Sequence, residues 1–444
     1  MMKSLISQAR SLRTNSIRQS SRRRNFSTTL RRPEIKNTES LPPRLIPSYQ
    51  ESNGNDLLSL QWPAPLRNIF VVKKDCAPEV TASLIEFISH TASTYPSIGI
   101  ILEPKVAEEV HSSLPFPVYS APVDRLPSAL HSKVDLSVTL GGDGTILHAS
   151  SLFATCVNVP PMLSFSMGTL GFLGEWKFAE YKRAFREVYM SGAGVGDRAS
   201  VLGIPPSQRT EEEPEEITGW SSVRGKSMGL NRGARILMRN RLKVGLFTAD
   251  GAPVEVVKCS EPSQEAQSEG LYVMNELLLH RGKEPHLAIV DVYVGGRFLT
   301  EAVADGMIIS TPTGSTAYSL SSGGSIVHPL VPAVLLTPIC ARSLSFRPLV
   351  LPASTSITLR LSEKNRGREL EVSIDGVNMT QGMTAGMEAR VWNEEMRHGK
   401  NEWQGGVPCV MRRVMGGEAP DSEAHDGWVG GLNGLLKFNY PFGE

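Results

Sequence analysis

A glycine-rich turn stands between a strand-like apolar run, residues 134–140, and a helical pattern. Its sequence is Gly141-Gly142-Asp143-Gly144-Thr145. Glycines allow positive φ and let a ligand approach the main chain closely. Amides at the start of a helix, together with the helix dipole, favour phosphate. The turn therefore predicts a phosphate site, while a tight turn in which the aspartate only caps the helix stays open as an alternative.

Asp143 is the unusual residue of this turn, because a carboxylate close to phosphates is electrostatically costly. An aspartate at this position is explained if its carboxylate accepts a proton from a hydroxyl group or acts through a metal ion. Asp143 is therefore the candidate catalytic residue.

A second loop, residues 310–324, follows a short apolar strand and is crowded with hydroxyls and glycines. Eleven of its fifteen residues are Ser, Thr or Gly. Many donors and little bulk suit a ribose-phosphate site. An ordinary Ser/Gly surface loop is the alternative.

Polar residues also stand at the ends of apolar segments elsewhere in the chain. Asn275 and Glu276 follow residues 271–274, Asp305 precedes the second loop, and Asp375 ends an alternating strand. Burial without partners is expensive, so these groups should meet a ligand or one another. Taken singly, each also fits a turn or a satisfied polar contact. Phe172, in a glycine-rich stretch, could stack on a base or belong to the core.

Other catalytic and metal signatures are missing from the sequence. The five cysteines stand far apart without a CxxC pair, and the nine histidines show no ligand spacing. No P-loop or GxSxG motif occurs. We therefore expect no dedicated metal site in the protein.

Periodicity predicts two domains of different class. Residues 66–192 alternate apolar strands with helical patterns, which indicates an α/β domain with a Rossmann-like parallel sheet. From 235 to about 400, period-2 alternation dominates and predicts a β-rich sandwich domain. A Gly295-Gly296 pair between apolar runs predicts a hairpin. Residues 193–234 are polar and contain an acidic run, which favours a solvated insertion, and residues 401–444 form a tail with little pattern.

The first 32 residues carry nine Lys or Arg and no acid, which is typical of a mitochondrial transit peptide. A basic arm that binds nucleic acid or anionic lipid is the alternative. Residues 33–65, rich in Pro, Ser and Asn, are expected to be a linker. Without the leader the net charge of +1 becomes −8, which argues against a nucleic-acid binder. The longest apolar run is under ten residues, so we expect no membrane span.

Taken together, these motifs resemble those of the NAD kinase family, and they occur in the family's order. The matching elements are Gly141–Thr145, Asn275-Glu276, Asp305-Gly306, Thr311–Tyr318 with Ser321 and Gly323-Gly324, and residues 373–376. The resemblance implies an N-terminal α/β domain, a C-terminal β-sandwich-like domain and a homo-oligomer. The arginine-rich leader and the tail resemble the fungal mitochondrial branch, whose members often prefer NADH, and imply the mitochondrial matrix.

By this resemblance, Asp143 matches the catalytic acid of the motif, and a set of other positions matches dinucleotide contacts. These are Gly144, Phe172, Asn275, Glu276, Asp305, Thr316, Ala317, Tyr318, Ser321 and Asp375. The amides of Gly141, Gly142 and Thr145 would hold phosphate. The chain departs from the family's pattern at Leu173, where many members have Tyr, and at Ser325, where Pro is usual.

The implied reaction is transfer of the ATP γ-phosphoryl group to the adenosine 2′-hydroxyl of NAD+ or NADH, with Mg²⁺ arriving on ATP. A lipid kinase of the diacylglycerol or sphingosine type would share only the GGDGT turn. A non-enzymatic NAD(P)-binding protein would keep the pocket without needing Asp143. The preference between NADH and NAD+, the phosphoryl donor and the subunit number stay open.

Overall fold

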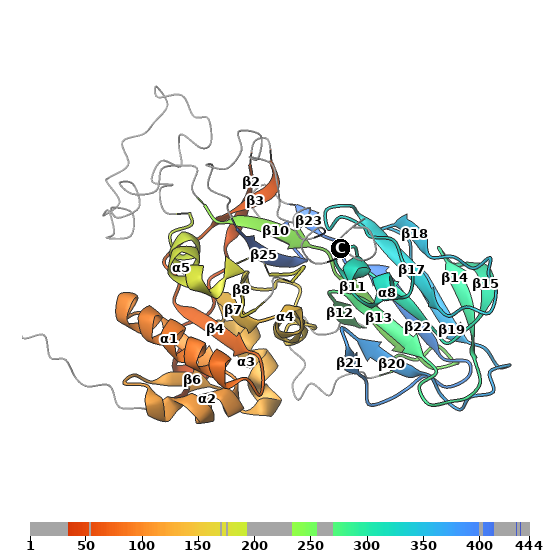
Figure 1. The fold of residues 1–444 in the computed structure, drawn as a ribbon, viewed down its shortest axis with the longest axis horizontal. Helices are drawn as coiled ribbons and strands as arrows, with labels where there is room; N and C mark the ends of the chain where they lie inside the picture. The colour runs from red at the N-terminus through yellow and green to blue at the C-terminus, as the bar shows by residue number, and fades with distance from the viewer. Residues whose placement is uncertain are drawn as a thin grey trace, which may run out of the picture.

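The structure is a computed structural model that describes residues 34–52, 55–168, 171–174, 176–192, 233–254, 270–398 and 403–412, together with Leu432 and Leu436. The expected transit peptide, most of the expected acidic insertion and the end of the tail lie outside the described residues. Two domains lie side by side, an α/β domain and a β-rich domain (Figure 1). No helix within the described ranges combines the length and apolarity that a membrane crossing requires.

The first domain is built on a parallel sheet. Its strands pair in the order β6-β5-β4-β7-β8. They are β4 (Asn68–Lys73), β5 (Gly99–Leu102), β6 (Val118–Ser120), β7 (Leu136–Gly141) and β8 (Met162–Ser166), with the short β9 (Trp176–Lys177) beside β8. Every residue of β4, β5, β7 and β8 is buried, which explains the continuous apolar runs of the sequence.

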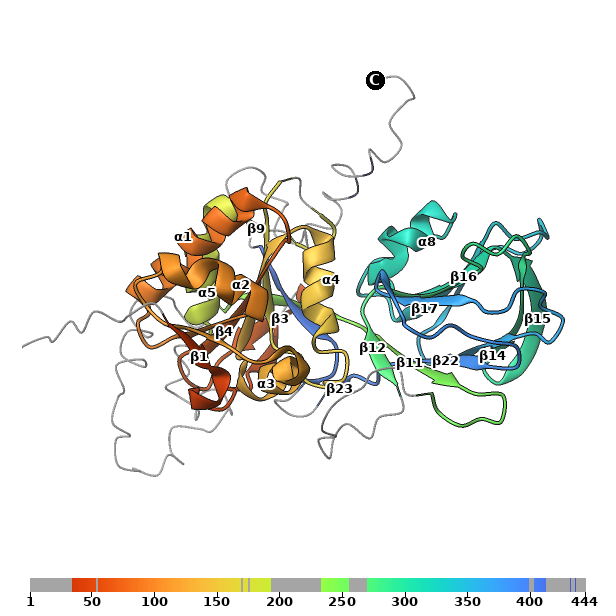
Figure 2. The ribbon, with the colours of Figure 1, turned by 90° about the horizontal axis from the view of Figure 1, so that it is seen from below.

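Helices pack on this sheet between the strands, as the alternating pattern predicts (Figures 1 and 2). They are α1 (Pro78–Thr94), α2 (Pro104–Val110), α3 (Leu126–Lys133), α4 (Asp143–Ser151) and α5 (Tyr181–Tyr189). Helix α1 begins with a proline, whose fixed φ suits the first turn, and it buries Leu84, Phe87 and Ile88 against the sheet. The predicted α/β class of this domain is confirmed.

The same sheet includes strands from outside residues 66–192, so the first domain is larger than the sequence predicts. It continues through strands from three distant segments. These are β1 (Ile35–Asn37), β2 (Ser48–Ser52) and β3 (Asn55–Gln61) from the expected linker, β10 (Arg235–Arg239) from the expected β-rich domain, and β25 (Val407–Met411) from the expected tail. Strand pairing over such separations leaves no local periodicity, and the prolines around β2 and β3 hide the hairpin.

The second domain consists of two facing six-stranded antiparallel sheets. One contains β11 (Leu242–Phe247), β12 (Leu271–Val273), β14 (Ala288–Val294), β15 (Arg297–Ala304), β19 (Ile357–Leu361) and β22 (Glu388–Asn393). The other contains β13 (Glu276–His280), β16 (Gly306–Ser310), β17 (Ala333–Ile339), β18 (Leu349–Pro352), β20 (Glu371–Ile374) and β21 (Val377–Asn378). Their inner faces share one apolar core, so the predicted β-sandwich is confirmed.

The predicted hairpin at Gly295-Gly296 is also confirmed. It joins β14 to β15, and both glycines have positive φ, 57° and 75°. Two residues with positive φ form the turn whose twist matches the strands of a hairpin.

The chain crosses between the domains at two places. The first crossover, Arg239-Asn240-Arg241, joins β10 to β11, and the second runs from β22 through Glu394 and the small β23 (Arg397–His398) and β24 (Trp403–Gln404) pair to β25. Helix α4 and the short helix α8 (Tyr318–Ser321) lie on facing sides of the boundary (Figures 1 and 2). A further link is the Tyr272 amide, which donates to the Ala154 carbonyl at 2.8 Å.

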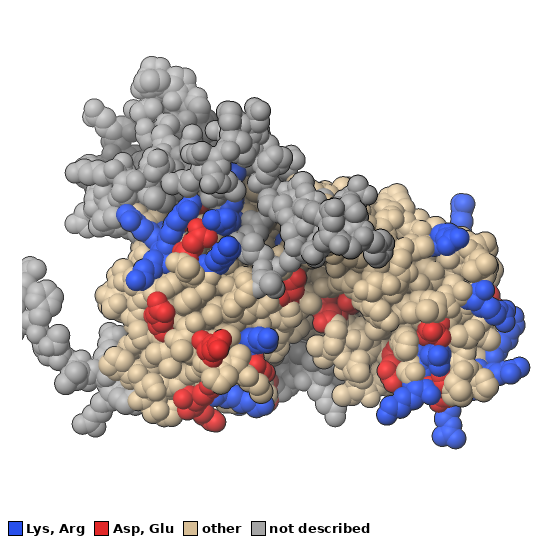
Figure 3. All heavy atoms as spheres, viewed as in Figure 1, with Lys and Arg blue, Asp and Glu red and all other residues tan. Residues whose placement is uncertain are grey.

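Charged side chains of both signs lie on the face drawn in Figure 3. Lys and Arg gather over α5 and over the outer end of the β-sandwich, and several acidic side chains lie between them, some close to the domain boundary. This face therefore carries no continuous basic surface among the described residues.

Candidate active site

Asp143 is the first residue of α4, directly after β7 and the extended Gly142. Its carboxylate accepts two backbone hydrogen bonds, one oxygen from the Phe172 amide at 3.0 Å and the other from the Leu173 amide at 3.1 Å. A side chain at Gly171 would clash with this carboxylate. Asp143 therefore holds the residue 171–174 loop beside the start of α4. Each oxygen keeps a lone pair for a further donor.

The glycines of this turn serve different purposes. Gly141 is buried, and a side chain there would clash with Thr145. Gly142 and Gly144 are exposed, and a Cβ at either position would meet nothing within 4 Å beyond its chain neighbours and the backbone of its own helix. Their main chain is thus open to a ligand, as a phosphate site requires. None of these three glycines uses the positive φ that glycine allows. Close packing at Gly141 and open space at Gly142 and Gly144 explain why glycine stands at these positions.

Asp375 plays a matching part in the second domain. It follows β20 with a positive φ of 48°, and its carboxylate accepts the amides of Met274, Asn275 and Glu276 at 2.9, 2.6 and 3.2 Å. Burial raises the pKa of Asp375, and these amide bonds oppose that rise. Asp375 therefore shapes the turn before β13, a role that the sequence does not reveal.

The side chains carried by this turn are buried but not satisfied. Asn275 is 6% exposed and Glu276 8% exposed, and Asn275 Oδ1 and Glu276 Oε2 have no hydrogen-bond partner among the described residues. Burial, and secondly the charge of Asp375, raises the pKa of Glu276 to about 8. Glu276 therefore carries its proton at neutral pH and can donate as well as accept. Unpaired buried polar atoms cost about 1–3 kcal/mol each, which a polar ligand would relieve.

The hydroxyl-rich loop is joined to the same turn. The Thr311 hydroxyl donates to the Met274 carbonyl at 2.7 Å and accepts the Gly314 amide at 3.0 Å. The Thr311 amide donates to the Asn275 carbonyl at 2.9 Å, and a side chain at Gly314 would clash with that carbonyl. The loop and Asn275 therefore form one rigid unit, and part of the hydroxyl content serves the loop itself.

Four predicted contact residues follow in this loop, and they are increasingly exposed along it. The Thr316 hydroxyl donates to the Thr313 carbonyl at 3.3 Å within the short turn η6 (Thr313–Thr316), and Ala317 is half-buried. Tyr318 is 39% exposed, and Ser321 is exposed as well. The two α8 side chains are thus accessible to a ligand at the domain boundary.

Asp305 is not brought together with this cluster. Strand β16 pairs with β13 so that Ser310 lies opposite Glu276 and Gly306 opposite His280. Asp305 therefore lies a whole strand away from Glu276, roughly 17 Å at 3.4 Å per residue. Its carboxylate pairs with the Arg281 guanidinium at 2.6 Å. Contact of Asp305 with a ligand stays a prediction.

Arg239, at the end of β10, is a site residue that the sequence reasoning missed. Its guanidinium donates to the Phe172 carbonyl at 3.3 Å and to the Thr313 hydroxyl at 3.4 Å. It therefore joins the loop held by Asp143 to the hydroxyl-rich loop. The available signal was a run of three polar residues, Arg239-Asn240-Arg241, between two strands whose neighbouring residues are apolar.

The described residues offer no protein-built metal centre. No group of three or more His, Cys, Asp or Glu among them could hold a metal ion. His148, in α4, is exposed and pairs with Glu103 at 2.9 Å. This pairing, which also raises the pKa of His148, turns its side chain to a surface carboxylate.

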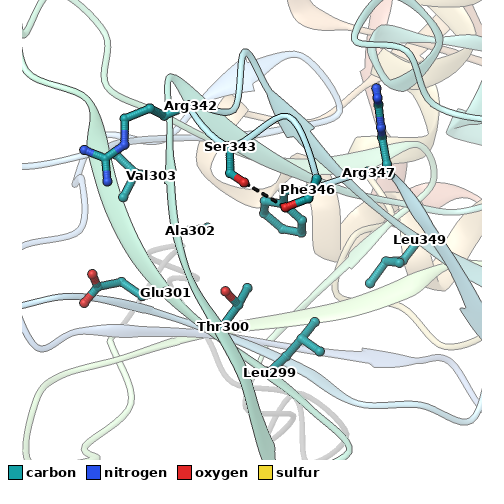
Figure 4. Close-up of a pocket in the computed structure, with 11 residues that line it drawn as sticks. Leu299, Thr300, Glu301, Ala302, Val303, Arg342, Ser343, Phe346, Arg347 and Leu349 are labelled. Carbon is teal, nitrogen blue, oxygen red and sulfur yellow. Dashed lines mark hydrogen bonds between the residues drawn. The ribbon is translucent and has the colours of Figure 1, made fainter.

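A separate pocket of about 350 Å³ lies on the second domain (Figure 4). It is formed by β15 and by the turn between β17 and β18, where the Ser343 and Ser345 hydroxyls hydrogen-bond at 2.9 Å. Arg342 and Arg347 also line it. The pocket includes none of the predicted site residues, so the candidate site rests on Asp143 and the Asn275-Glu276 turn.

The fold and this site are those of a two-domain kinase that acts on a nucleotide substrate. Comparisons with known proteins support this class. Residues 69–193 match the family model described as the ATP-NAD kinase N-terminal domain, and residues 274–395 match the ATP-NAD kinase C-terminal domain. The two matches cover the α/β domain and most of the sandwich. The chain belongs to the ATP-NAD kinase family.

Among its relatives are two fungal enzymes. The chain is 34% identical to the mitochondrial NADH kinase POS5 of Saccharomyces cerevisiae, over 92% of this chain and 89% of that protein. It is 37% identical to the mitochondrial NADH kinase pos5 of Schizosaccharomyces pombe, over 92% and 86%. A crystal structure of yeast NADH kinase complexed with NADH matches with a TM-score of 0.70 and 34% identity, covering 92% of this chain and 97% of that one.

Proposed function

We propose that this protein transfers the γ-phosphoryl group of ATP to the 2′-hydroxyl of the adenosine ribose of NADH or NAD+, giving NADPH or NADP+. The observation that carries the proposal is the buried Asn275-Glu276 pair. Asn275 Oδ1 and Glu276 Oε2 lack partners among the described residues, in a chain that belongs to the ATP-NAD kinase family. A ribose and an adenine ring offer the donors and acceptors that such a pair needs.

Asp143 would accept the proton of the 2′-hydroxyl as the phosphoryl group arrives. A positioned general base contributes about 10²–10⁴-fold to a rate. Its two amide contacts fix the direction of the carboxylate, and each oxygen retains capacity for a hydroxyl donor. Because the transition state of phosphoryl transfer is loose, placement of the two substrates matters more than base strength.

The open main chain at Gly142 and Gly144 would bind phosphate oxygens at the start of α4. The Thr145 amide belongs to the same turn but donates to the Gly142 carbonyl at 3.0 Å, so a phosphate would have to share it. Mg²⁺ would neutralise charge on the triphosphate and arrive bound to ATP, since the described residues provide no cluster of ligands for it. Phe172, Thr316, Ala317, Tyr318 and Ser321 would contact the dinucleotide, with Asp375 acting through the turn that it holds.

The cellular setting is part of the same proposal. Both fungal relatives are named as mitochondrial, and residues 1–32 have the composition of a transit peptide, so we place the mature enzyme in the mitochondrial matrix. Exposed apolar side chains on β15 and β18, such as Phe298, Leu299 and Val350, support a homo-oligomer.

No observation favours the two alternatives. A lipid kinase would need neither the Asn275-Glu276 turn nor the loop joined to it, yet both are built in detail. A sensor without activity would need Asp143 only to hold the 171–174 loop, whereas the two fungal relatives of the chain are named as kinases.

The direct test is a product assay on the purified chain. Incubation with ATP and Mg²⁺ and with NADH, NAD+ or diacylglycerol in parallel should yield a phosphorylated dinucleotide, identified by chromatography, and no phosphorylated lipid. Measurement of kcat/KM for NADH and NAD+ side by side then defines the acceptor. A protein that phosphorylates the lipid, or neither dinucleotide, contradicts the proposal.

A further inference from the structure

The first crossover between the domains holds three buried polar residues in a row. Arg239, Asn240 and Arg241 are 2%, 7% and 1% exposed. Full burial of one arginine is unusual, and burial of two within three residues needs a reason, because removing a guanidinium from water costs several kcal/mol unless it is paired.

Arg241 has such a reason, which is structural. Its guanidinium pairs with Glu394 on the second crossover through contacts of 2.9 and 2.5 Å. It also donates to the carbonyls of Phe153, Cys156 and Val157 at 3.0–3.4 Å. The Gly406 amide also donates a hydrogen bond to the Glu394 carboxylate, at 2.8 Å. Arg241 therefore ties the two crossovers to the segment that follows α4. Its positive charge, which a lysine would keep, also lowers the pKa of Asp375.

Arg239 has a different environment. Among the described residues no carboxylate pairs with it, and its Nε atom is buried without a partner. Its two hydrogen bonds, at 3.3 and 3.4 Å, go to the Phe172 carbonyl and the Thr313 hydroxyl, which belong to different domains. A buried guanidinium held only by two neutral acceptors adds little net stability.

We propose that Arg239 is a positioning residue for phosphoryl transfer, an inference that rests on the proposed function. The Phe172 amide donates to Asp143 while the Phe172 carbonyl accepts from Arg239. The other arm of Arg239 fixes Thr313, in the loop that is joined to Asn275. Arg239 thereby sets the distance between the carboxylate that takes the proton and the turn that holds the adenosine.

The planar guanidinium group of Arg239 is essential to this role, because it must hold two acceptors on different loops at once. Lysine keeps the positive charge but offers a single point donor that cannot hold both acceptors in a fixed geometry. A misplacement of about 1 Å in a reacting pair can cost 10²-fold in rate. The effect should therefore fall on kcat and leave the KM for the dinucleotide nearly unchanged.

The test compares four purified full-length proteins: the wild type, Arg239→Lys, Thr313→Val and Arg241→Lys. For each, kcat and KM are measured with ATP and NADH at a temperature well below unfolding, and Tm is measured by calorimetry. Arg241→Lys is the matched control, since it makes the same exchange two residues away on the structural side of the crossover.

We expect Arg239→Lys to lose about 10²-fold in kcat, with KM for NADH changed less than about threefold and Tm nearly retained. Thr313→Val, which removes one arm, should lose about tenfold. Arg241→Lys should lower Tm by several degrees and keep the kcat of its folded fraction.

An Arg239→Lys variant with near wild-type kcat overturns the inference, and so does one whose loss of activity equals its loss of folded protein. If the wild type forms no phosphorylated dinucleotide, the proposed function fails and this inference falls with it. If the wild type is active and Arg239→Lys equally so, only the inference fails.

Discussion

On both sides of the candidate site an aspartate carboxylate accepts backbone amides, but the surroundings of the two carboxylates differ. On the α/β side Asp143 accepts two backbone amides, and on the sandwich side Asp375 accepts three. The first carboxylate is half-buried beside two exposed glycines, whereas the second is buried and the turn it holds carries side-chain atoms without partners.

This difference separates two tasks. Open main chain at a helix start suits a triphosphate, which is charged, hydrated and bound through many amides. A buried turn with unpaired amide and carboxyl atoms suits a neutral, shaped group such as an adenosine, because the ligand can supply the missing hydrogen bonds. Changes on the first side should therefore act on rate and on ATP, and changes on the second on stability and on the dinucleotide.

The largest effect is expected at Asp143. Asp143→Asn keeps the size of the side chain but removes the proton acceptor, and its NH₂ group faces one of the two amides that the carboxylate accepts. The loss of the base should lower kcat about 10³-fold, and the lost amide bond should lower the unfolding free energy by about 1 kcal/mol. The Kd for NADH, measured by calorimetry, should change little, since the adenosine is held on the other side. A variant with most of the wild-type kcat would show that Asp143 is only a structural anchor for the 171–174 loop.

The pH dependence of stability should report the burial of Glu276 on the sandwich side. Burial raises the pKa of Glu276 from 4.5 to about 8. The folded state then keeps a proton that the unfolded chain releases. The stabilisation is complete below about pH 4.5 and is lost as pH rises towards 8.

Relative to Glu276→Gln, which cannot ionise, the ligand-free wild type should lose roughly 3–4 kcal/mol of unfolding free energy between pH 5 and 8. Urea unfolding of both proteins at each pH measures the difference. Parallel curves would mean that Glu276 is already ionised and solvated in the folded protein.

Asp375→Asn should act mainly on folding. Asparagine tolerates the positive φ of this position, but its NH₂ group opposes one of the three amides and the charge is lost. We expect a loss of about 2–3 kcal/mol in unfolding free energy, together with a raised KM for NADH. Unchanged stability with abolished kcat would instead assign Asp375 to the reacting groups.

The smallest effect is expected at Gly144, which lies inside the first turn of α4 with open space around it. Gly144→Ala should stabilise the helix by less than about 1 kcal/mol. The added methyl group would hinder the approach of phosphate, so the KM for ATP should rise while Tm rises slightly. An unchanged KM would place the triphosphate elsewhere.

Much of this arrangement follows from sequence patterns. Alternating apolar runs predicted the parallel sheet, period-2 alternation predicted the sandwich, and the GGDGT turn and residues 310–324 marked both sides of the site. What failed depends on long-range pairing. Strands β1, β2 and β3 join the first sheet from the expected linker and β25 joins it from the expected tail. Strand β10 joins it from the segment expected to belong to the β-rich domain.

The same reason limited the site prediction. Nothing in the local sequence shows that the Asp375 carboxylate accepts the amides of residues 274–276. Nor does it show that Asp305 lies one strand length from Glu276, paired with Arg281. Arg239 reads as an ordinary charged residue until the fold brings Phe172 and Thr313 to its two arms.

The central claim is that one adenosine ribose meets both sides at once. A crystal structure of the Asp143→Asn variant with NADH and ATP tests it most directly. We expect the ribose 2′-oxygen to lie about 2.6–3.2 Å from the residue 143 side chain, with the adenosine on Asn275 and Glu276. A dinucleotide bound to Asn275 and Glu276 whose 2′-oxygen points away from residue 143 would contradict it.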